Sequence, residues 1–384
     1  MQSQHLRDIT RSITYDRLLP KLNSVAQGNG RIDGLDLSYC ICVDYLSSFI
    51  FGYSNGTNYL SQPKSAIDVW RFHYENLMCQ ESFFVQETPS LYKLLRYISI
   101  DLLPRKYTES ADFLERWMSD MASKADRATD RKRSTGLPLA LEDEPVVYDM
   151  AKEAVRKDSP HLSEGDQRKQ VASEMFDHIS AAREVLGLVL GYAFWYLAQH
   201  PDAQQRIQTE LYSQGIDMRS RETVTNSSKR PRAVELDSLP YLRAVIDECL
   251  RMHPTSTPLP RITPPNRKVS VAGIDGIPPG TRINTFQWFV HRDPQKWDNA
   301  HDWNPDRWLT RGNTDNKNER EDVLWAFASG PRMCLGNNWT YYAMQHILAT
   351  ICSSFNFTAL PREENQCWPG SPEDELPIRV CLRN

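Results

Sequence analysis

The strongest apolar stretch of the chain covers residues 185–198, VLGLVLGYAFWYLA, and follows an amphipathic segment at 166–184. Fourteen uncharged residues are too few to cross a bilayer, which needs about 20. The pattern therefore predicts one long helix that crosses the protein core, with the amphipathic segment as its first half. Pro201 ends this helix, because proline cannot continue a helical hydrogen-bond ladder.

Other segments also show helical periodicity. Residues 6–52 carry periodic apolar positions, a Gly-rich break and then a second long helix. In the segment LDSLPYLRAVIDECLRMHP, Asp237 or Ser238 is expected to cap a helix that has Pro240 in its first turn and stops at Pro254.

Alternation and turn residues indicate a smaller β component. Residues 268–272 and 282–286 alternate in polarity around Gly-Ile-Pro-Pro-Gly, which predicts a small hairpin-like sheet. Two charged stretches rich in helix breakers, 124–136 and 219–232, are expected to be surface loops. These patterns favour a mainly α fold with small sheets.

Composition limits the function classes. No linker or composition break divides the 384 residues, so we expect a single domain over 1–384. A net charge of −4 gives no electrostatic case for nucleic-acid binding. The eight cysteines show neither metal-knuckle nor disulfide-scaffold spacing, which suits a reducing compartment, and Cys40 and Cys42 are expected in the core of a helix. We expect no signal peptide and no membrane-spanning segment.

One cysteine stands in a reactive setting, in the segment FASGPRMCLG at 327–336. A lone cysteine in an apolar segment is usually a core residue. Cys334, however, directly precedes a helix-like run, where the helix dipole and free N–H groups stabilise a thiolate. Gly330 and Gly336 allow backbone to lie close to a flat macrocycle, and Arg332 can pair with an acidic group such as a haem propionate.

The spacing F-x-x-G-x-R-x-C-x-G resembles the haem-binding loop of the cytochrome P450 family, the haem-thiolate monooxygenases. Glu248 and Arg251, which on an arbitrary helix would be a surface ion pair, resemble the E-x-x-R pair of that family. The segment WNPDRW at 303–308 resembles its P-E-R-F segment, with Asp306 in place of Glu. The resemblance implies that Arg307 joins Glu248 and Arg251 in a buried triad bracing the haem loop, within a motif-bearing core at 171–384.

The long central helix also resembles a family element, the helix over the distal face of the haem. Its A-G-x-D/E-T motif matches Ala181, Ala182, Arg183, Glu184 and Val185. The resemblance implies a catalytic role for Ala181, Ala182 and Glu184, with Glu184 on the proton route. Val185 lacks the usual threonine hydroxyl and cannot hold a water. An alternative is therefore haem-thiolate chemistry without oxygen insertion, such as rearrangement or dehydration.

The resemblance also implies a cofactor and partners. Haem b would be held by Cys334, with Phe327 near the sulfur and with Arg332 and Arg261 near the propionates. It further implies O2, NADPH-cytochrome P450 reductase, and insertion of oxygen into a lipophilic small molecule, as in fungal secondary metabolism. Segments expected to line the substrate pocket are 83–104, 255–260 and 369–377. Full-length relatives are anchored in the endoplasmic reticulum membrane and have a cytosolic catalytic domain.

Compared with that pattern, the chain is expected to lack the N-terminal anchor and the first helices, including one that contacts haem. A catalytically inactive truncated remnant is therefore a second alternative. A third is a hydrolase with Cys334 as nucleophile and His253 or His291 as base, for which no motif supplies an oxyanion hole.

Overall fold

The computed structural model describes residues 3–77, 82–219, 233–254, 260–309, 324–362 and 374–383. The chain divides into two compact units. We call residues 2–24 and 39–183 the N-terminal unit, and residues 25–38 and 184–384 the C-terminal unit. The fold is mainly helical with small antiparallel sheets, as predicted.

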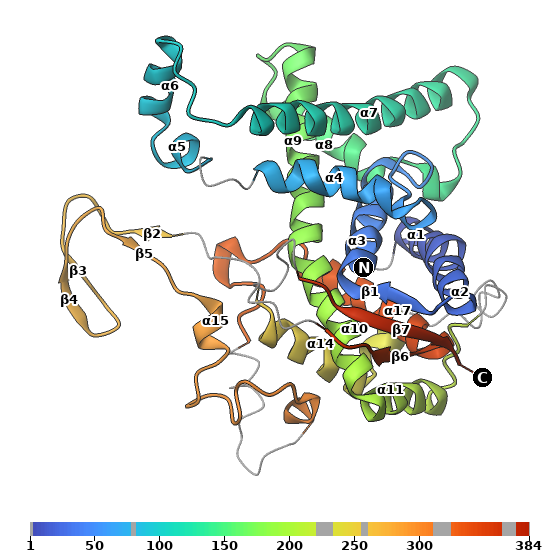
Figure 1. The fold of residues 1–384 in the computed structure, drawn as a ribbon. Helices are drawn as coiled ribbons and strands as arrows, with labels where there is room; N and C mark the ends of the chain where they lie inside the picture. The colour runs from blue at the N-terminus through green and yellow to red at the C-terminus, as the bar shows by residue number, and fades with distance from the viewer. Residues whose placement is uncertain are drawn as a thin grey trace. The chain divides into compact units, whose positions relative to one another are not determined.

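The N-terminal unit is helical (Figure 1). It contains most of α3 (Gly34–Phe51), which carries the buried Cys40 and Cys42, as expected. Its other elements are α1 (Gln4–Ser12), the π-helix η1 (Ile13–Leu18), most of α2 (Leu19–Gln27), η2 (Tyr59–Ser61), α4 (Lys64–Leu77), α5 (Ser82–Glu87), α6 (Pro89–Tyr97), α7 (Arg105–Thr135), η3 (Leu141–Asp143), α8 (Val146–Asp158) and α9 (Glu164–Ala181).

The C-terminal unit combines helices with short strands. Its helical elements are most of the π-helix η4 (Ala182–Gly187), α10 (Leu188–Gln199), α11 (Pro201–Ser213), α13 (Ala233–Asp237), α14 (Pro240–Met252), α15 (Gln287–Val290), η5 (Pro305–Trp308), η6 (Gly330–Arg332) and α17 (Asn337–Ser354). Its strands are β1 (Arg31–Asp33), β2 (Arg261–Ile262), β3 (Val269–Val271), β4 (Ile274–Ile277), β5 (Arg282–Ile283), β6 (Phe355–Ala359) and β7 (Pro377–Leu382).

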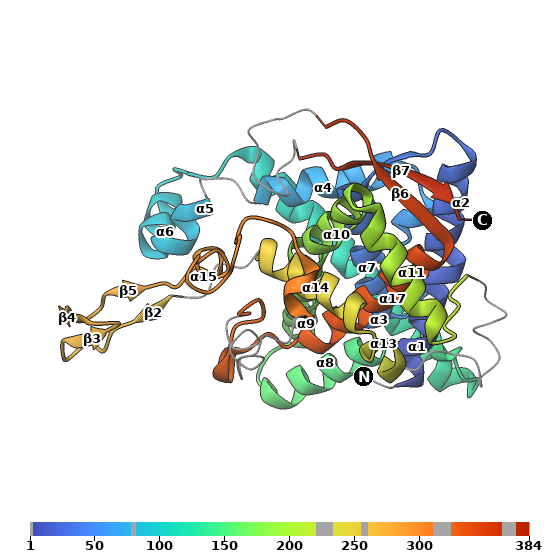
Figure 2. The ribbon, with the colours of Figure 1, turned by 90° about the horizontal axis from the view of Figure 1, so that it is seen from below.

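The largest sheet has the order β1-β7-β6 and lies beside α10 and α11 (Figures 1 and 2). All its pairs are antiparallel, with Arg31 opposite Arg379 and Phe357 opposite Val380. Close packing on the other flank of α10 requires Gly191, because a Cβ there would lie 2.8 Å from Leu35 Cδ2. The apolar α10 is thus buried between the sheet and the start of α3.

The predicted long central helix is present as a continuous run of α9, η4 and α10. It ends at Gln199, and Pro201 occupies the first turn of α11. A π-helical segment in its middle was not predicted. Among the described residues, one helix, α3, is long and apolar enough to cross a membrane, but 83% of it is buried, which is also typical of a core helix. Against the expectation of no membrane-spanning segment, α3 is therefore weak evidence.

The small sheet was predicted with the wrong partners. β3 pairs with β4 across the tight turn at Ala272 and Gly273, whereas β5 pairs with β2, so the alternating segments 268–272 and 282–286 are not paired with each other. In both views these ribbons extend away from the helices of the C-terminal unit (Figures 1 and 2). The short helix α15 directly precedes His291.

Residues 124–136 were predicted as a loop, which is wrong. They form the last third of α7, where Arg133 and Asp130 pair within the helix at 3.8 Å. Gly136 ends α7 in the left-handed conformation, with φ of 69°. Of the other predicted loop, 219–232, only Arg219 belongs to the described residues.

The predicted cap of α14 is also wrong. Its N-cap is Leu239, and no side chain of Asp237 or Ser238 caps the helix. Glu210 of α11 supplies the acceptors instead, because its carboxylate accepts the N–H groups of Tyr241 (2.7 Å) and Leu242 (2.9 Å). Burial raises the pKa of Glu210, and these two hydrogen bonds oppose that shift. The helix thus begins and ends as predicted but is capped from a distant segment.

Candidate haem-thiolate site

Cys334 lies three residues before α17, in a loop with an exposed thiol. Its backbone N–H donates to Phe327 O (2.8 Å), which closes the loop on itself. The backbone N–H of Gly336 donates to Cys334 Sγ at 3.3 Å. Gly330 turns the chain with φ of 71°, a conformation that side chains with a Cβ disfavour. The sulfur therefore receives a backbone N–H group next to a helix N-terminus.

The other described cysteines differ from Cys334. Burial raises the pKa of both Cys249 and Cys352 to about 12, so both remain thiols at neutral pH. Cys40 and Cys42 are also buried. Cys381 is exposed, but it is paired in the β6–β7 ladder rather than placed at a helix N-terminus. Among the described residues, Cys334 is thus the cysteine best placed to ligate a metal.

The surroundings of Cys334 fit a haem. Met333 and Leu335 flank it with side chains that are 53% and 88% exposed, so apolar surface surrounds the thiol. Arg332 lies in η6, two residues before Cys334, and is exposed with no ion pair to a described residue. A soft sulfur ligand, apolar flanks and a nearby guanidinium group match a macrocycle that carries iron and carboxylates. Arg261 is exposed in β2, and its role near a propionate stays a prediction. The Phe327 ring is half-buried and lies 5.4 Å from the Tyr341 ring, which holds it against α17.

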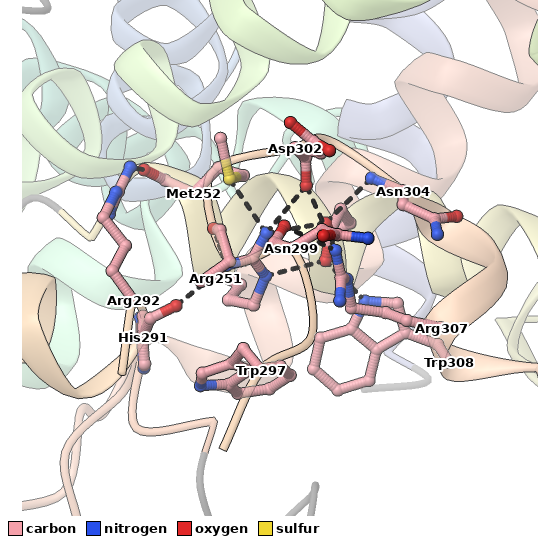
Figure 3. A network of polar contacts seen from close by, with 12 residues as sticks. Arg251, Met252, His291, Arg292, Trp297, Asn299, Asp302, Asn304, Arg307 and Trp308 are labelled. Atoms are coloured by element: carbon pink, nitrogen blue, oxygen red, sulfur yellow. Dashed lines mark hydrogen bonds and ion pairs between the residues drawn. The ribbon is translucent and has the colours of Figure 1, made fainter. Parts of the chain in front are cut away.

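The structure brings Glu248, Arg251 and Arg307 together. Figure 3 shows the two arginines within a network of polar contacts. Arg251 donates two hydrogen bonds to the Glu248 carboxylate, from Nη2 to Oε1 at 2.8 Å and from Nε to Oε2 at 2.9 Å. Arg307 Nε donates to Oε1 at 3.0 Å. Glu248 and Arg251 are fully buried and Arg307 is 8% exposed. A buried charge group of this kind is stable only when its members are paired and hydrogen-bonded.

The remaining donors of the triad bind the segment that precedes the cysteine loop (327–336) in the sequence. Arg251 Nη1 donates to the carbonyls of His291 (2.8 Å) and Ala300 (2.7 Å). Arg307 Nη1 donates to Asp298 O at 2.7 Å. Arg307 Nη2 also donates to Asn299 O at 3.4 Å, so four backbone carbonyls from 291–300 are bound to the two arginines. Through these hydrogen bonds the triad holds the backbone of residues 291–300. That it also braces the cysteine loop stays a prediction.

Two further groups bind Glu248 and were missed in the sequence. Trp308 Nε1 donates to Oε2 at 3.0 Å, and the backbone N–H of Asn304 donates to Oε1 at 2.9 Å. The carboxylate thus accepts from both arginines, an indole and an amide. The residue that departs from the family pattern, Asp306, points elsewhere and pairs with Arg206 at the surface. This departure does not disturb the triad.

The predicted distal residues lie where α9 changes into η4. Ala181 is the last residue of α9 and is exposed, whereas Ala182 is 7% exposed. Glu184 and Val185 are half-buried within η4, a π-helical turn of the kind often found at functional sites. Ala181 and Ala182 belong to the N-terminal unit, and Glu184 and Cys334 to the C-terminal unit. The catalytic roles of these residues stay predictions.

Arg183, at the variable position of this motif, has an environment that the sequence did not indicate. It is 4% exposed and lies 3.7 Å from Glu75 of α4. Its guanidinium also lies over the rings of Tyr39 (4.3 Å) and Tyr74 (5.0 Å). Arginine in such a stacked and paired site fixes the helix turn that carries it.

The hydrolase alternative finds no support in the two histidines. Burial lowers the pKa of His253 to about 3 and that of His291 to about 4. His253 Nε2 is hydrogen-bonded to the Tyr196 hydroxyl (2.9 Å), and His291 Nε2 accepts the N–H of Trp325 (2.9 Å). Both are weak bases already engaged elsewhere, and the described hydrogen bond of Cys334 Sγ is to Gly336.

Comparisons with known proteins agree with this geometry. The family model described as Cytochrome P450 matches residues 6–376. The chain is similar to cytochrome P450 monooxygenase ORF9 of Penicillium roqueforti, with 25% identity over 94% of this chain and 62% of that protein. It is also similar to cytochrome P450 monooxygenase asR2 of Sarocladium schorii, with 30% identity over 56% of this chain and 41% of that protein. A flavonoid 3',5'-hydroxylase of Eustoma exaltatum subsp. russellianum is 31% identical over 50% of this chain and 36% of the relative. The chain thus spans between about a third and two thirds of the curated relatives it matches.

Proposed function

Because the chain belongs to the cytochrome P450 family, whose members bind haem through a cysteine thiolate, we propose that it carries the haem-binding part of a monooxygenase that acts on a lipophilic small molecule. The observation that carries this proposal is the exposed thiol of Cys334, which accepts the Gly336 N–H at the start of α17. That the relatives named above include fungal monooxygenases supports a place in secondary metabolism.

Each residue of the loop has a stated task in this proposal. Cys334 would supply the thiolate ligand, and the Gly336 N–H, which donates to its sulfur, would stabilise the charge. Arg332 and Arg261 would bind the propionates, and Gly330 and Gly336 would allow the backbone to come close to the macrocycle. Haem b, when bound in this way, supplies the capacity to activate O2. The triad keeps the segment before the loop in place by binding its backbone carbonyls.

Within the long central helix, Ala181 and Ala182 are proposed to leave room for a substrate, and Glu184 to hold or deliver a proton. Val185 has no hydroxyl to share this task, so proton delivery depends on Glu184, ordered water or a hydroxyl of the substrate. Electrons come from NADPH through a flavoprotein reductase, NADPH-cytochrome P450 reductase, that docks on the Cys334 side. Because members of the family are often membrane-anchored, we expect the whole protein to act at the endoplasmic reticulum membrane. Of the predicted pocket segments, 255–259 and 369–373 lie outside the described residues, and 83–104 includes α5 and α6.

Isotopic oxygen tests this function. The haem-loaded chain, a flavoprotein reductase, NADPH and ¹⁸O2 are incubated with a set of lipophilic probe compounds, with Cys334→Ser as the control. We expect NADPH use that depends on O2 and a product that carries ¹⁸O. Product formed equally without O2 would instead support rearrangement or dehydration. Absence of any haem-dependent reaction in a chain that binds haem would support the inactive remnant.

Val185 provides a second test. Val185→Thr restores the hydroxyl that the family motif has, so we expect a larger fraction of NADPH to yield product in this variant. Val185→Ala, which lacks both the hydroxyl and the branched shape, is the matched control. An unchanged fraction in Val185→Thr would indicate that protons come from the substrate or that O2 is not used.

A further inference from the structure

A cavity lies entirely within the N-terminal unit, apart from the cysteine loop at 327–336. It has a volume of about 400 Å³, within the range of small-molecule sites. One side is a stripe of α7 from Tyr107 to Asp126, and the other side is α9 from Arg168 to Phe176. Leu77 of α4 and Tyr148 of α8 complete its wall. The space exists because the two long helices face each other with small residues, including Ala111, Ala122 and Ala172.

One end of this cavity is apolar. Leu114 and Met118 of α7 are buried at 3% and 2% exposure and form its floor. Phe176 lies 6.3 Å, centroid to centroid, from Tyr74 of α4, the helix that ends at Leu77. Apolar side chains from α4, α7 and α9 therefore converge at this end, and they favour a hydrocarbon body.

The other end is polar: the cations Arg168, Lys169 and Lys152 lie on its side of the unit, and the carboxylates there are Asp126 and Asp149, both of which act on Tyr148. The Tyr148 hydroxyl donates to Asp126 (3.3 Å), and Lys152 pairs with the same carboxylate. Burial and the charge of Asp126 raise the pKa of Tyr148, whereas the positive charge of Arg168 acts in the opposite direction, so Arg168 lies close to this end. With Asp126 neutralised by Lys152, the guanidinium of Arg168 and the ammonium of Lys169 have no ion pair with a described residue.

The two ends are well separated. From Ala111 to Asp126 the cavity follows 15 residues of α7, which corresponds to about 22 Å at the helical rise per residue. Glu115, an acidic group on the rim, lies about three helical turns from Asp126 and so does not cancel the positive end. The cavity is thus elongated, apolar at one end and cationic at the other.

From these features we propose that the cavity between α7 and α9 binds a linear apolar molecule with a terminal carboxylate, a long-chain fatty acid, with its head at Arg168 and its chain along Leu114 and Phe176. This binding goes beyond the proposed monooxygenase function and uses neither haem nor Cys334. Apolar burial holds the chain, and a charge-assisted hydrogen bond to Arg168 fixes the head group.

The test uses cis-parinaric acid, a linear fluorescent fatty acid, titrated into the full chain. We expect saturable binding, with equal affinity before and after haem loading. Ala111→Trp fills the cavity and should abolish binding, whereas Asp112→Trp, one residue away and outside the lining, should leave the affinity unchanged. Helix content and cooperative unfolding establish that both variants are folded. Binding by Ala111→Trp equal to that of the wild type, or binding that requires haem, would overturn the proposal.

The head group is tested by charge. Arg168→Glu should weaken binding of the acid by at least about tenfold, because it removes a charge-assisted hydrogen bond and adds repulsion. Arg116→Glu, an exposed position of α7 outside the cavity, is the charge-matched control. The corresponding alcohol, which has the same chain without the carboxylate, should bind the wild type and Arg168→Glu equally. An equal loss for acid and alcohol would contradict the assignment of the head group to Arg168.

Discussion

The buried triad and the cysteine loop lie in the same unit but are built in opposite ways. Around Glu248, every carboxylate contact is satisfied by an arginine, an indole or an amide, and the group is shielded from water. Around Cys334, the thiol and its apolar neighbours are exposed, and one N–H bonds the sulfur. The residues that stabilise the backbone of this unit are therefore different from the residue proposed to bind haem iron. The buried triad holds the backbone, whereas the sulfur of Cys334 is exposed and accessible to a ligand.

The largest effect on the free energy of unfolding should come from breaking the buried triad. Glu248→Ala leaves Arg251 and Arg307 buried without their counterion, so we expect a loss of about 3 to 5 kcal/mol in the free energy of unfolding. Asp306→Ala, which removes an exposed pair with Arg206, should cost at most about 1 kcal/mol. Urea denaturation of both variants measures the difference. Similar losses in the two variants would contradict the separate role of the triad.

The next largest effect should be a pH dependence of the free energy of unfolding that is caused by the buried His253. Burial lowers the pKa of His253 to about 3, below the unfolded value of about 6.5, so the unfolded state binds the proton first. Its contribution to stability is complete above about pH 6.5 and falls as the pH decreases toward 3, by about 1.4 kcal/mol per pH unit.

Denaturation of the wild type and of His253→Gln between pH 7.5 and 5 checks this expectation. The variant should show the shallower dependence of unfolding free energy on pH, because one titrating group has been removed. Parallel curves would mean that His253 is not held neutral in the folded protein.

A smaller effect should follow removal of the distant helix cap. Glu210→Ala deprives the N–H groups of Tyr241 and Leu242 of their acceptors and should cost about 1 to 2 kcal/mol. Ser238→Ala is the matched control, since its hydroxyl bonds Glu235 O rather than capping α14. If Ser238→Ala costs more than Glu210→Ala in thermal unfolding, the cap has been assigned to the wrong residue.

The smallest effect should come from the open loop. Gly330→Ala introduces a Cβ at φ of 71° with nothing within 4 Å of it, so backbone strain alone should cost about 1 kcal/mol. Gly165→Ala, in a helix with ordinary φ, should be neutral or slightly stabilising. Calorimetry of both variants tests whether the loop tolerates change far better than the triad does.

The same contrast explains what could be predicted from sequence. Local signals predicted the bounds of α14 and the long central helix, because proline positions and apolar periodicity depend on residues close together in the sequence. Contacts between distant segments could not be predicted this way. The Glu210 cap, the pairing of β5 with β2, and the partners of Arg183 all join residues far apart in the chain.

The end of α7 shows a different error. Its charged residues were taken for a loop, although arginine and lysine are good helix formers, and Gly136 offered a readable stop signal. The π-helical turn η4 had no signal of its own, since its residues also fit an ordinary helix.

The most direct test of the central claim is the carbon monoxide difference spectrum of the reduced, haem-supplemented chain, recorded for Cys334→Ser and Cys381→Ser. Both cysteines are exposed, but only Cys334 directly precedes the N-terminus of α17. We expect the strongly red-shifted Soret band of a thiolate-ligated haem in the wild type and in Cys381→Ser. We expect this band to be lost in Cys334→Ser. The same red-shifted band in Cys334→Ser would contradict the assignment of Cys334 as the axial ligand.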